Sequence, residues 1–231
     1  MIRLENKVVL VTGAKGGLGS FVTEALLAAG ATVVGVSRSI RQSDFAHAAF
    51  HAHAAELGSL DAAVKAVGAV VAGQGRLDAV VHLVGGFDMG PNVEETGDDA
   101  FARMFELNFY SALHLFRAAL PGMRAQGSGR LVAIGSRAAV EPGPHTSAYN
   151  VSKAALVSLV RTIAEETKAA GISANVVLPG TMDTAANRAA MPGAVFSQWV
   201  QPAQVAALIV HLVSDEASQL TGAAIPIYGG S

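Results

Sequence analysis

The sequence predicts an α/β fold in which a doubly wound parallel sheet is flanked by helices, and three observations support this. Short runs rich in β-branched residues alternate with longer Ala- and Leu-rich stretches of helical period. The short runs are almost continuously apolar, as expected for parallel strands that are covered on both faces. A glycine-rich segment separates the first run from the first helical stretch. Ligands of this fold bind beyond the carboxyl ends of the strands, so functional residues should directly follow strands.

The expected elements alternate along the chain. The first strand, residues 7–12, precedes a helix that stops at Gly30 and whose apolar face comprises Leu18, Val22, Ala25, Leu26 and Ala29. The second strand covers residues 32–37, and a histidine-rich stretch at 46–53 leads into a third strand region. Four further strands at 78–84, 129–136, 172–179 and 223–230 give a sheet of about seven strands. The remaining helices are expected near 60–73, 99–126, 148–170 and 203–214.

The composition predicts one soluble domain over residues 1–231 that acts on a small molecule. Hydrophobic residues make up 51% and charged residues 15% of the 231 positions, enough for a large core. The net charge of -2 and the lack of Lys or Arg runs argue against a nucleic-acid partner. No run approaches the roughly 18 apolar residues of a membrane span, and the N-terminus lacks signal-peptide features. The absence of cysteine excludes disulfides and thiolate metal sites and fits a cytoplasmic, reducing location.

The glycine loop at residues 12–19, TGAKGGLG, is the first candidate site. Gly13 permits a tight turn, Gly17 lets the backbone approach a phosphate, and Gly19 lets the helix pack closely on the strand. Free N–H groups at the start of the helix favour an anion there. Because the loop lies between the first strand and the first helix of an alternating chain, it predicts a dinucleotide site that includes Gly16 and Leu18.

The end of the second strand predicts which dinucleotide is preferred. NAD sites usually carry an acid there that binds the ribose hydroxyls, whereas a basic residue suits the 2′-phosphate of NADP. This strand ends with Ser37 and Arg38, and Lys15 in the glycine loop could reach the same phosphate. We therefore expect NADP to be preferred, with NAD as the alternative. The alternative without a binding function is that Lys15 and Arg38 are simply two solvated cations at the surface.

Three polar residues are candidates for catalysis. Tyr149 and Lys153 lie one turn apart on the same face of a predicted helix. A tyrosine with a pKa of about 10 needs a nearby cation for acid-base chemistry at neutral pH, and Lys153 could supply it. Ser136 ends the preceding strand, at the same edge as the glycine loop, where its hydroxyl can hydrogen-bond a substrate oxygen. Their convergence predicts proton transfer beside a bound nicotinamide, although an isolated Tyr and Lys at this spacing are more often a surface contact.

With these motifs the sequence resembles the short-chain dehydrogenase/reductase family over essentially its full length, in its compact single-domain branch with a Rossmann fold. The matching pieces stand in the family's order and at family-like separations: Thr12-Gly13-x-x-x-Gly17-x-Gly19, Leu77-Asp78, Asn108, Ser136, Tyr149-x-x-x-Lys153, Pro179-Gly180 with Thr184, and the closing TG and GG at 221–230. The resemblance implies an NAD(P)-dependent enzyme that interconverts a ketone and a secondary alcohol by hydride transfer.

The resemblance also implies a role for each candidate residue. Tyr149 would exchange a proton with the carbonyl oxygen, which Ser136 would orient and polarise. Lys153 would lower the pKa of Tyr149 and hold the nicotinamide ribose. Asn108 would maintain a water relay to Lys153, unless it is merely a polar residue facing solvent or backbone. The cofactor would also contact Gly85, Pro179, Gly180, Thr181 and Thr184, and Glu56 stands near the position where the family often has an acid that contacts adenine.

The segment after the central strand departs from the family pattern Asn-Asn-Ala-Gly. The aligned residues are His82, Leu83, Val84 and Gly85, followed by Gly86 and Phe87. Gly85 keeps the close approach of backbone to cofactor, but the two amides are absent. We expect His82 to be a structural hydrogen-bonding residue, because Tyr149 and Lys153 already supply the proton chemistry. The glycine pair and aromatic also resemble dihydropteridine reductases, and a catalytically silent nucleotide-binding protein is a further alternative.

A short flap near residues 181–202 corresponds to the segment that covers the substrate in the family. The candidates for an apolar substrate pocket are Phe87, His145, Met182 and Trp199, with Met89, Met191 and Phe196 as further wall residues. The alternative for each apolar residue is packing of the flap onto the core. No cluster of cations indicates a carrier-protein or coenzyme A substrate, so a modest carbonyl compound is expected.

Two further expectations concern metals and assembly. His47, His51 and His53 have metal-like spacing, but no acid or thiolate completes a site nearby, so no metal is expected. The helices near 99–126 and 148–170 are apolar around much of their circumference, which predicts a partner besides the sheet. The family usually pairs such helices in a dimer, often within a tetramer, so we expect a homo-oligomer, either a dimer or a homotetramer.

Overall fold

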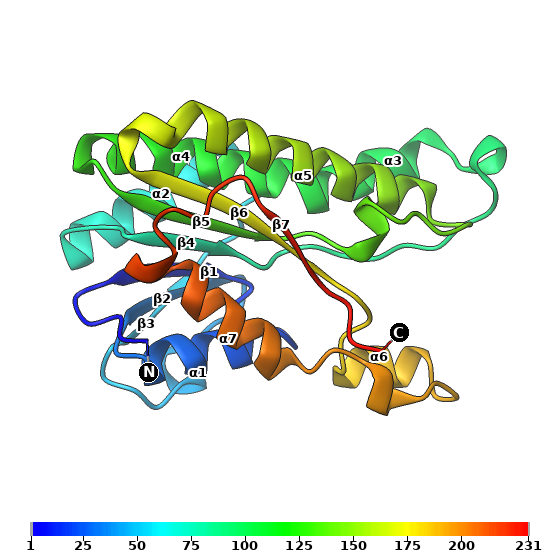
Figure 1. The fold of residues 1–231 in the computed structure, drawn as a ribbon, viewed down its shortest axis with the longest axis horizontal. Coiled ribbons are helices and arrows are strands. Elements are labelled where there is room, and N and C mark those ends of the chain that lie inside the picture. The colour runs from blue at the N-terminus through cyan, green and yellow to red at the C-terminus, as the bar shows by residue number, and fades with distance from the viewer. Residues whose placement is uncertain (1, 231) are drawn as a thin grey trace.

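A seven-stranded parallel sheet forms the centre of the computed structural model, which describes residues 2–230 (Figure 1). Its strand order is β3-β2-β1-β4-β5-β6-β7, with every neighbouring pair parallel. The strands are β1 (Val8–Thr12), β2 (Thr32–Ser37), β3 (Phe50–Ala54), β4 (Ala79–His82), β5 (Gly129–Ile134), β6 (Ile172–Pro179) and β7 (Ala224–Ile227). The order reverses between β1 and β4, which is where ligands of doubly wound sheets bind. The predicted fold class is confirmed.

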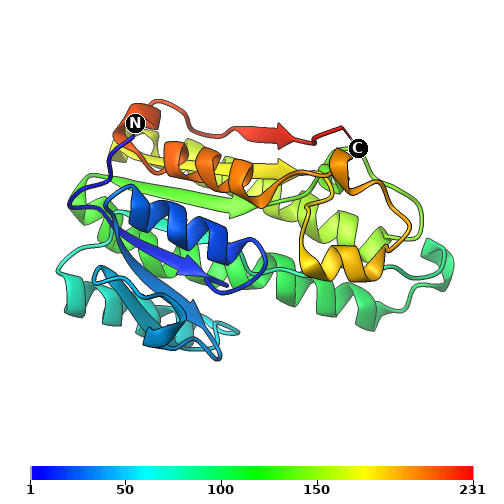
Figure 2. The ribbon, with the colours of Figure 1, turned by 90° about the horizontal axis from the view of Figure 1, so that it is seen from below.

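Helices cover both faces of the sheet (Figures 1 and 2). One layer contains α1 (Gly19–Ala28) and α7 (Pro202–Leu212). The other contains α2 (Leu60–Gln74), α4 (Ser111–Gln126) and α5 (Ser147–Thr167), with α3 (Asp98–Phe105) at its end. The short α6 (Ala185–Ala190) lies within the expected flap (Figure 1).

The core explains why the strands are apolar without alternation. On β1, Val8 and Leu10 belong to the hydrophobic cluster beneath α2, α4 and α5, whereas Val9 and Val11 belong to the cluster beneath α1 and α7. Successive side chains of a strand point to opposite faces, so a strand buried on both faces must be apolar at every position.

The expected helix over residues 99–126 is interrupted, which the hydrophobic period did not indicate. A π-helical turn, Glu106–Tyr110, separates α3 from α4. In an ideal α-helix the backbone N–H of Ser111 would donate to the carbonyl of Leu107. Here it donates to the carbonyl of Glu106, one residue earlier. A π-helical turn contains one residue more than an α-helical turn, but the apolar residues keep a helical spacing across it. The sequence pattern therefore still resembles one long helix. The other expected elements differ from the observed ones chiefly at their ends.

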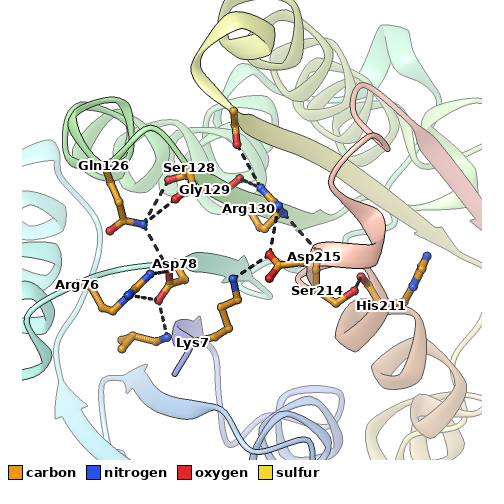
Figure 3. Close-up of polar contacts among 12 residues, drawn as sticks. Lys7, Arg76, Asp78, Gln126, Ser128, Gly129, Arg130, His211, Ser214 and Asp215 are labelled. Carbon is orange, nitrogen blue, oxygen red and sulfur yellow. Dashed lines mark hydrogen bonds and ion pairs between the residues drawn. The ribbon is translucent and has the colours of Figure 1, made fainter. Parts of the chain in front are cut away.

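The amino ends of the central strands are joined by a network of charged and amide groups (Figure 3). The carboxylate of Asp78 accepts the backbone N–H of Val8 at 2.8 Å and two bonds from Arg76 at 2.8 and 2.6 Å. Arg130 donates to the carbonyls of Gly129 and Gly171, at 2.9 and 3.2 Å. Asp78 therefore links β1 to β4 at the edge opposite the candidate active site.

Replacing Asp78 with alanine should lower the free energy of unfolding by about 1–3 kcal/mol, because the N–H of Val8 and the guanidinium of Arg76 lose their acceptor. Urea denaturation at fixed protein concentration, followed by circular dichroism, measures this. The matched control is Lys65→Ala, which removes an exposed ion pair with Asp61 and should cost less than about 1 kcal/mol. An equal loss of unfolding free energy in the two variants would contradict the structural role assigned to Asp78.

Candidate active site

The glycine loop between β1 and α1 has the geometry of an anion site. Gly13 has φ +67° and donates its N–H to the carbonyl of Val36 at 2.8 Å, which fixes the turn. A Cβ on Gly19 would stand 2.0 Å from the carbonyl oxygen of Gly13, so only glycine fits there. The N-cap, Leu18, offers no side-chain hydrogen bond, and the first turn of α1 contains no acid. The N–H groups at the start of α1 therefore have no competing carboxylate.

The flap reaches this loop through Thr184. A Cβ on Gly17 would stand 3.2 Å from the methyl carbon of Thr184, so the two residues are direct neighbours. The flap is anchored at its base, where the N–H of Val200 donates to Thr181 at 2.9 Å and that of Asp183 donates to Val200 at 2.8 Å. Pro179 ends β6, and Gly180 follows it against the backbone of Tyr228. The expected cofactor residues of the loop and of the flap thus lie together.

The expected 2′-phosphate residues gather at the end of β2, but each cation has a carboxylate beside it. Lys15 Nζ donates to the carbonyl of Ser39 at 2.8 Å and stands 3.3 Å from Asp44 Oδ2. Arg38 stands 3.8 Å from the carboxylate of Glu56. The sequence does not point to Asp44, because it lies 29 residues beyond Lys15 and in no motif. Ser37 supplies a buried hydroxyl that has no hydrogen-bond partner among residues 2–230.

Ser136, Tyr149 and Lys153 converge beyond the end of β5. Ser136 follows β5, and Tyr149 and Lys153 lie in the first two turns of α5. The side chain of Ser136 hydrogen-bonds Tyr149, and its oxygen also accepts the N–H of Ala138 at 3.2 Å. Lys153 is buried and donates to the carbonyl of Ile134 at 2.9 Å. The three polar groups therefore share one wall at the carboxyl edge of the sheet.

The acid-base properties of this wall follow from burial. Burial raises the pKa of Tyr149, and the hydrogen bond from Ser136 only partly opposes this. Burial also lowers the pKa of Lys153 to about 8. Lys153 is not among the groups that shift the pKa of Tyr149, and its expected lowering of that pKa stays a prediction. Its ammonium group bonds a backbone carbonyl, and desolvation of the phenol outweighs other effects.

Asn108 lies in the π-helical turn and faces the backbone of the segment after β4. Its Oδ1 accepts the N–H of Gly86 at 2.9 Å, and its Nδ2 donates to the carbonyl of Gly86 at 3.1 Å. The same Nδ2 lies 3.1 Å from the hydroxyl of Ser152 on α5. A Cβ on Gly85 would stand 2.9 Å from Asn108 Oδ1 and 3.0 Å from Lys153 Nζ. The glycine at position 85 therefore lets the backbone approach both side chains.

His82 is a buried hydrogen-bonding residue, as predicted. Its Nδ1 lies 3.0 Å from the hydroxyl of Thr12, and its Nε2 lies 3.1 Å from that of Ser111. The Ser111 hydroxyl also donates to the carbonyl of Leu107 at 2.7 Å, an acceptor that the π-helical turn leaves free. Because a hydroxyl has one proton to donate, Ser111 must accept from Nε2–H, which assigns the neutral Nε2–H tautomer. Burial, aided by the charge of Lys153, lowers the pKa of His82 to about 3.

The four expected substrate residues differ in their positions. The ring of Phe87 packs edge-on against Tyr149 with centroids 5.0 Å apart and is 63% exposed. His145 has φ +61°, and its carbonyl accepts the N–H of Gly90 at 2.8 Å. Met182 is partly buried against the core. Trp199 is only 7% exposed and packs on Phe196 with centroids 4.8 Å apart, so in this structure it supports the flap and offers a substrate almost no surface.

The histidine-rich stretch forms part of the edge strand β3, which contains His51 and His53. Among residues 2–230, no group of three or more His, Cys, Asp or Glu side chains is arranged to hold a metal ion. Within the same residues, no helix is long and apolar enough to cross a membrane.

Comparisons with known proteins agree with this geometry. The family model described as short chain dehydrogenase matches residues 7–194. The chain is 32% identical to the uncharacterized oxidoreductase YvrD of Bacillus subtilis, over 99% of this chain and 97% of that protein. It is 29% identical to a 7alpha-hydroxysteroid dehydrogenase of Bacteroides fragilis, over 100% of this chain and 96% of that protein. A solved short-chain type dehydrogenase/reductase from Mycobacterium ulcerans has a TM-score of 0.90 and 29% identity, covering 99% of this chain and 90% of that one.

These matches define the class of protein as an NAD(P)-dependent oxidoreductase. The chain belongs to the short-chain dehydrogenase/reductase family. It is an enzyme, so the alternative of a catalytically silent nucleotide-binding protein is not retained.

His82 should make the protein less stable at mildly acidic pH. Its pKa is about 3 in the folded protein and about 6.5 when unfolded, so the unfolded state binds an extra proton as the pH falls below about 6.5. The stability it contributes is present above pH 6.5 and is lost towards pH 3. Between pH 7 and pH 5 this amounts to about 2 kcal/mol.

Urea denaturation at pH 7 and pH 5 measures this loss, which His82→Asn should largely abolish. His51→Asn, on the edge strand, is the matched control and should leave the pH dependence unchanged. If the His82 and His51 variants keep the same pH dependence as the parent, the neutral buried histidine is not its source.

Proposed function

We propose that the protein is an NADP(H)-preferring oxidoreductase that interconverts a ketone and a secondary alcohol, with Tyr149 as the general acid and base. The observation that carries this proposal is the shared wall of Ser136, Tyr149 and Lys153 beside the glycine loop. A cofactor-dependent hydride transfer needs a proton donor or acceptor at the substrate oxygen, and a buried tyrosine with a serine neighbour suits that task.

The residues present fit a nicotinamide dinucleotide. The uncapped start of α1 and the glycines at 13, 16, 17 and 19 suit the pyrophosphate, with Leu18 at the N-cap. Lys15, Ser37 and Arg38 would hold the adenosine end. The nicotinamide half would lie along Gly85, Tyr149, Lys153 and the flap residues Pro179, Gly180, Thr181 and Thr184. When bound, the cofactor supplies or accepts the hydride.

Residues of the protein transfer the proton and orient the substrate. Ser136 donates a hydrogen bond to the carbonyl oxygen and holds it beside the hydroxyl of Tyr149. The raised pKa of Tyr149 keeps the phenol protonated at neutral pH, which is the state that carbonyl reduction requires. Lys153 is still largely protonated at pH 7, so its charge favours the phenolate that forms as the proton leaves. Asn108 positions the backbone at Gly86 and thereby the wall on which the nicotinamide lies.

The substrate in this proposal is a modest carbonyl compound with apolar surface. Phe87 stands exposed against the ring of Tyr149, and His145 and Met182 come from the segments on either side. The flap near 181–202 would close over the substrate, with Trp199 as its internal support. A hydroxysteroid dehydrogenase among the relatives is consistent with a secondary alcohol as the reduced form.

A dihydropteridine-reductase-like activity is the alternative, suggested by Gly85, Gly86 and Phe87. The two glycines have a structural explanation that needs no pterin. A Cβ on Gly85 would meet Asn108 and Lys153, and a Cβ on Gly86 would meet the side chain of Leu107. The intact Ser136 also favours the ketone reaction.

Replacing Tyr149 with phenylalanine should lower kcat at least about 100-fold, because general acid catalysis contributes factors of this order. The dissociation constant of NADPH should change little, since the ring and its packing on Phe87 remain. Oxidation of NADPH and NADH is followed spectrophotometrically across small ketones, acyl thioesters, quinones, sugars and quinonoid pterins.

Ketone-dependent turnover that Tyr149→Phe abolishes supports the proposal. Turnover confined to pterins would favour the alternative. A Tyr149→Phe variant as active as the parent would overturn the role of the tyrosine.

We also propose that the protein assembles as a homo-oligomer in the cytoplasm. The outer face of α5 has a shallow hollow of about 400 Å³ lined by Ala139, Val140, Ala154, Val157, Ser158, Arg161, Thr162 and Glu165. Ala139, Ala154 and Ser158 in this lining are small and leave room for a side chain of a second protomer.

Light scattering coupled to size exclusion should give the mass of a dimer or tetramer. Ala154→Arg places a large charge in the hollow and should shift the protein towards the monomer. A parent protein that elutes as a monomer of 23.5 kDa would contradict the assembly.

A further inference from the structure

Lys15 links the glycine loop to the end of β2. Its backbone belongs to the loop after β1, and its Nζ donates to the carbonyl of Ser39 at 2.8 Å, two residues beyond the last residue of β2. In doubly wound dinucleotide-binding folds, the ribose hydroxyls and the 2′-phosphate of the adenosine half are read at this strand end. The ammonium group of Lys15 is therefore held where the two cofactors differ.

Asp44 stands on the other side of this ammonium group. It ends the 3-10 helix Gln42–Asp44, and its Oδ2 accepts the N–H of Arg41 at 2.9 Å while standing 3.3 Å from Lys15 Nζ. The bond from the Arg41 backbone, followed by the effects of Lys15, lowers the pKa of Asp44. Asp44 is therefore ionised at neutral pH. The side chains of Lys15 and Asp44 are 38% and 26% exposed, so a bound cofactor can reach both.

A second, looser pair lies beside the first. Arg38 stands 3.8 Å from Glu56, and these side chains are 79% and 73% exposed. Lys15 and Arg38 thus each have a carboxylate partner, and the charge of Arg41 also acts on Asp44. A 2′-phosphate brings close to two negative charges at pH 7, and the two acids weaken the attraction that these cations exert on it. A ribose hydroxyl can instead donate a hydrogen bond to a carboxylate.

We propose that Asp44 determines cofactor specificity by supplying, from the segment after β2, the carboxylate that the end of β2 lacks. By pairing with Lys15 it narrows the preference for NADP(H) over NAD(H). This inference rests on the proposed cofactor site and concerns only its adenosine end.

The test is Asp44→Asn, which removes the charge and keeps an oxygen that can accept the N–H of Arg41. The dissociation constants of NADPH and NADH are measured by fluorescence titration at low, fixed salt. The ratio of the NADH constant to the NADPH constant should rise about two- to fivefold, as expected for a partly exposed ion pair. The rise should be smaller when Lys15→Met is already present, because part of the effect acts through Lys15 and part through the direct bond of the carboxylate to the ribose.

Glu5→Gln is the matched control. It removes a charge from an exposed pair in which Glu5 stands 3.3 Å from Arg3, before the start of β1, and it should leave the ratio unchanged. If Asp44→Asn folds poorly, Asp44→Ser replaces it, because serine also keeps a short acceptor for the N–H of Arg41. The same rise in the ratio is expected.

An unchanged ratio in both Asp44 variants would overturn the inference, and so would a rise of the same size with and without Lys15→Met. A parent protein that binds neither dinucleotide would instead contradict the proposed cofactor site. A parent that binds both, with a ratio insensitive to Asp44, contradicts only the inference.

Discussion

The burial of Lys153 beneath the carboxyl ends of β4 and β5 is the constraint on which the rest of the site depends. A buried ammonium group requires acceptors, and the carbonyl of Ile134 at the end of β5 provides one. The neighbouring backbone must come close as well, and Gly85 permits this because it has no Cβ. Asn108, which lies in the π-helical turn, then holds the adjacent peptide of Gly86 through two hydrogen bonds. The π-helical turn between α3 and α4 and the glycine pair after β4 thus pack against each other, through Asn108 at Gly85 and Leu107 at Gly86.

His82 belongs to the same arrangement. Its imidazole connects Thr12 on β1 to Ser111 at the start of α4, and Ser111 uses the carbonyl that the π-helical turn releases. A charged imidazole would repel Lys153 and would have to shed its hydration, so the ring is neutral and its two nitrogens have fixed roles. The family amide at this position can likewise donate and accept. His82 therefore replaces the chemistry of an amide while filling more of the core.

Much of this could be predicted from the sequence because it depends on local patterns. The apolar runs and the glycine, tyrosine and lysine spacings indicate the strands, the glycine loop and the Tyr149–Lys153 pair, since each lies within one element or between two consecutive ones. What could not be predicted depends on contacts between elements. The π-helical turn keeps the hydrophobic spacing of a continuous helix, so no sequence period reveals it. Trp199 has the character of a pocket residue, and only the packing of the flap shows that it is covered. The pKa of Tyr149 depends on burial, which charge spacing does not report.

The two ends of the candidate cofactor site differ in how their charges are solvated. They therefore differ in which amino-acid substitutions they tolerate. Around Lys153 the polar groups are buried and mutually satisfied, so a change to one leaves another without a partner, at a cost of about 1–3 kcal/mol for each unsatisfied group. At the end of β2 the ion pairs are partly exposed, and water can replace either partner at a cost below about 1 kcal/mol. Substitution in the first region threatens the fold together with the proposed chemistry, whereas substitution in the second would, in the proposed cofactor site, mainly change which dinucleotide binds. In that proposal, cofactor preference can shift through single surface carboxylates while Ser136, Tyr149 and Lys153 keep their contacts.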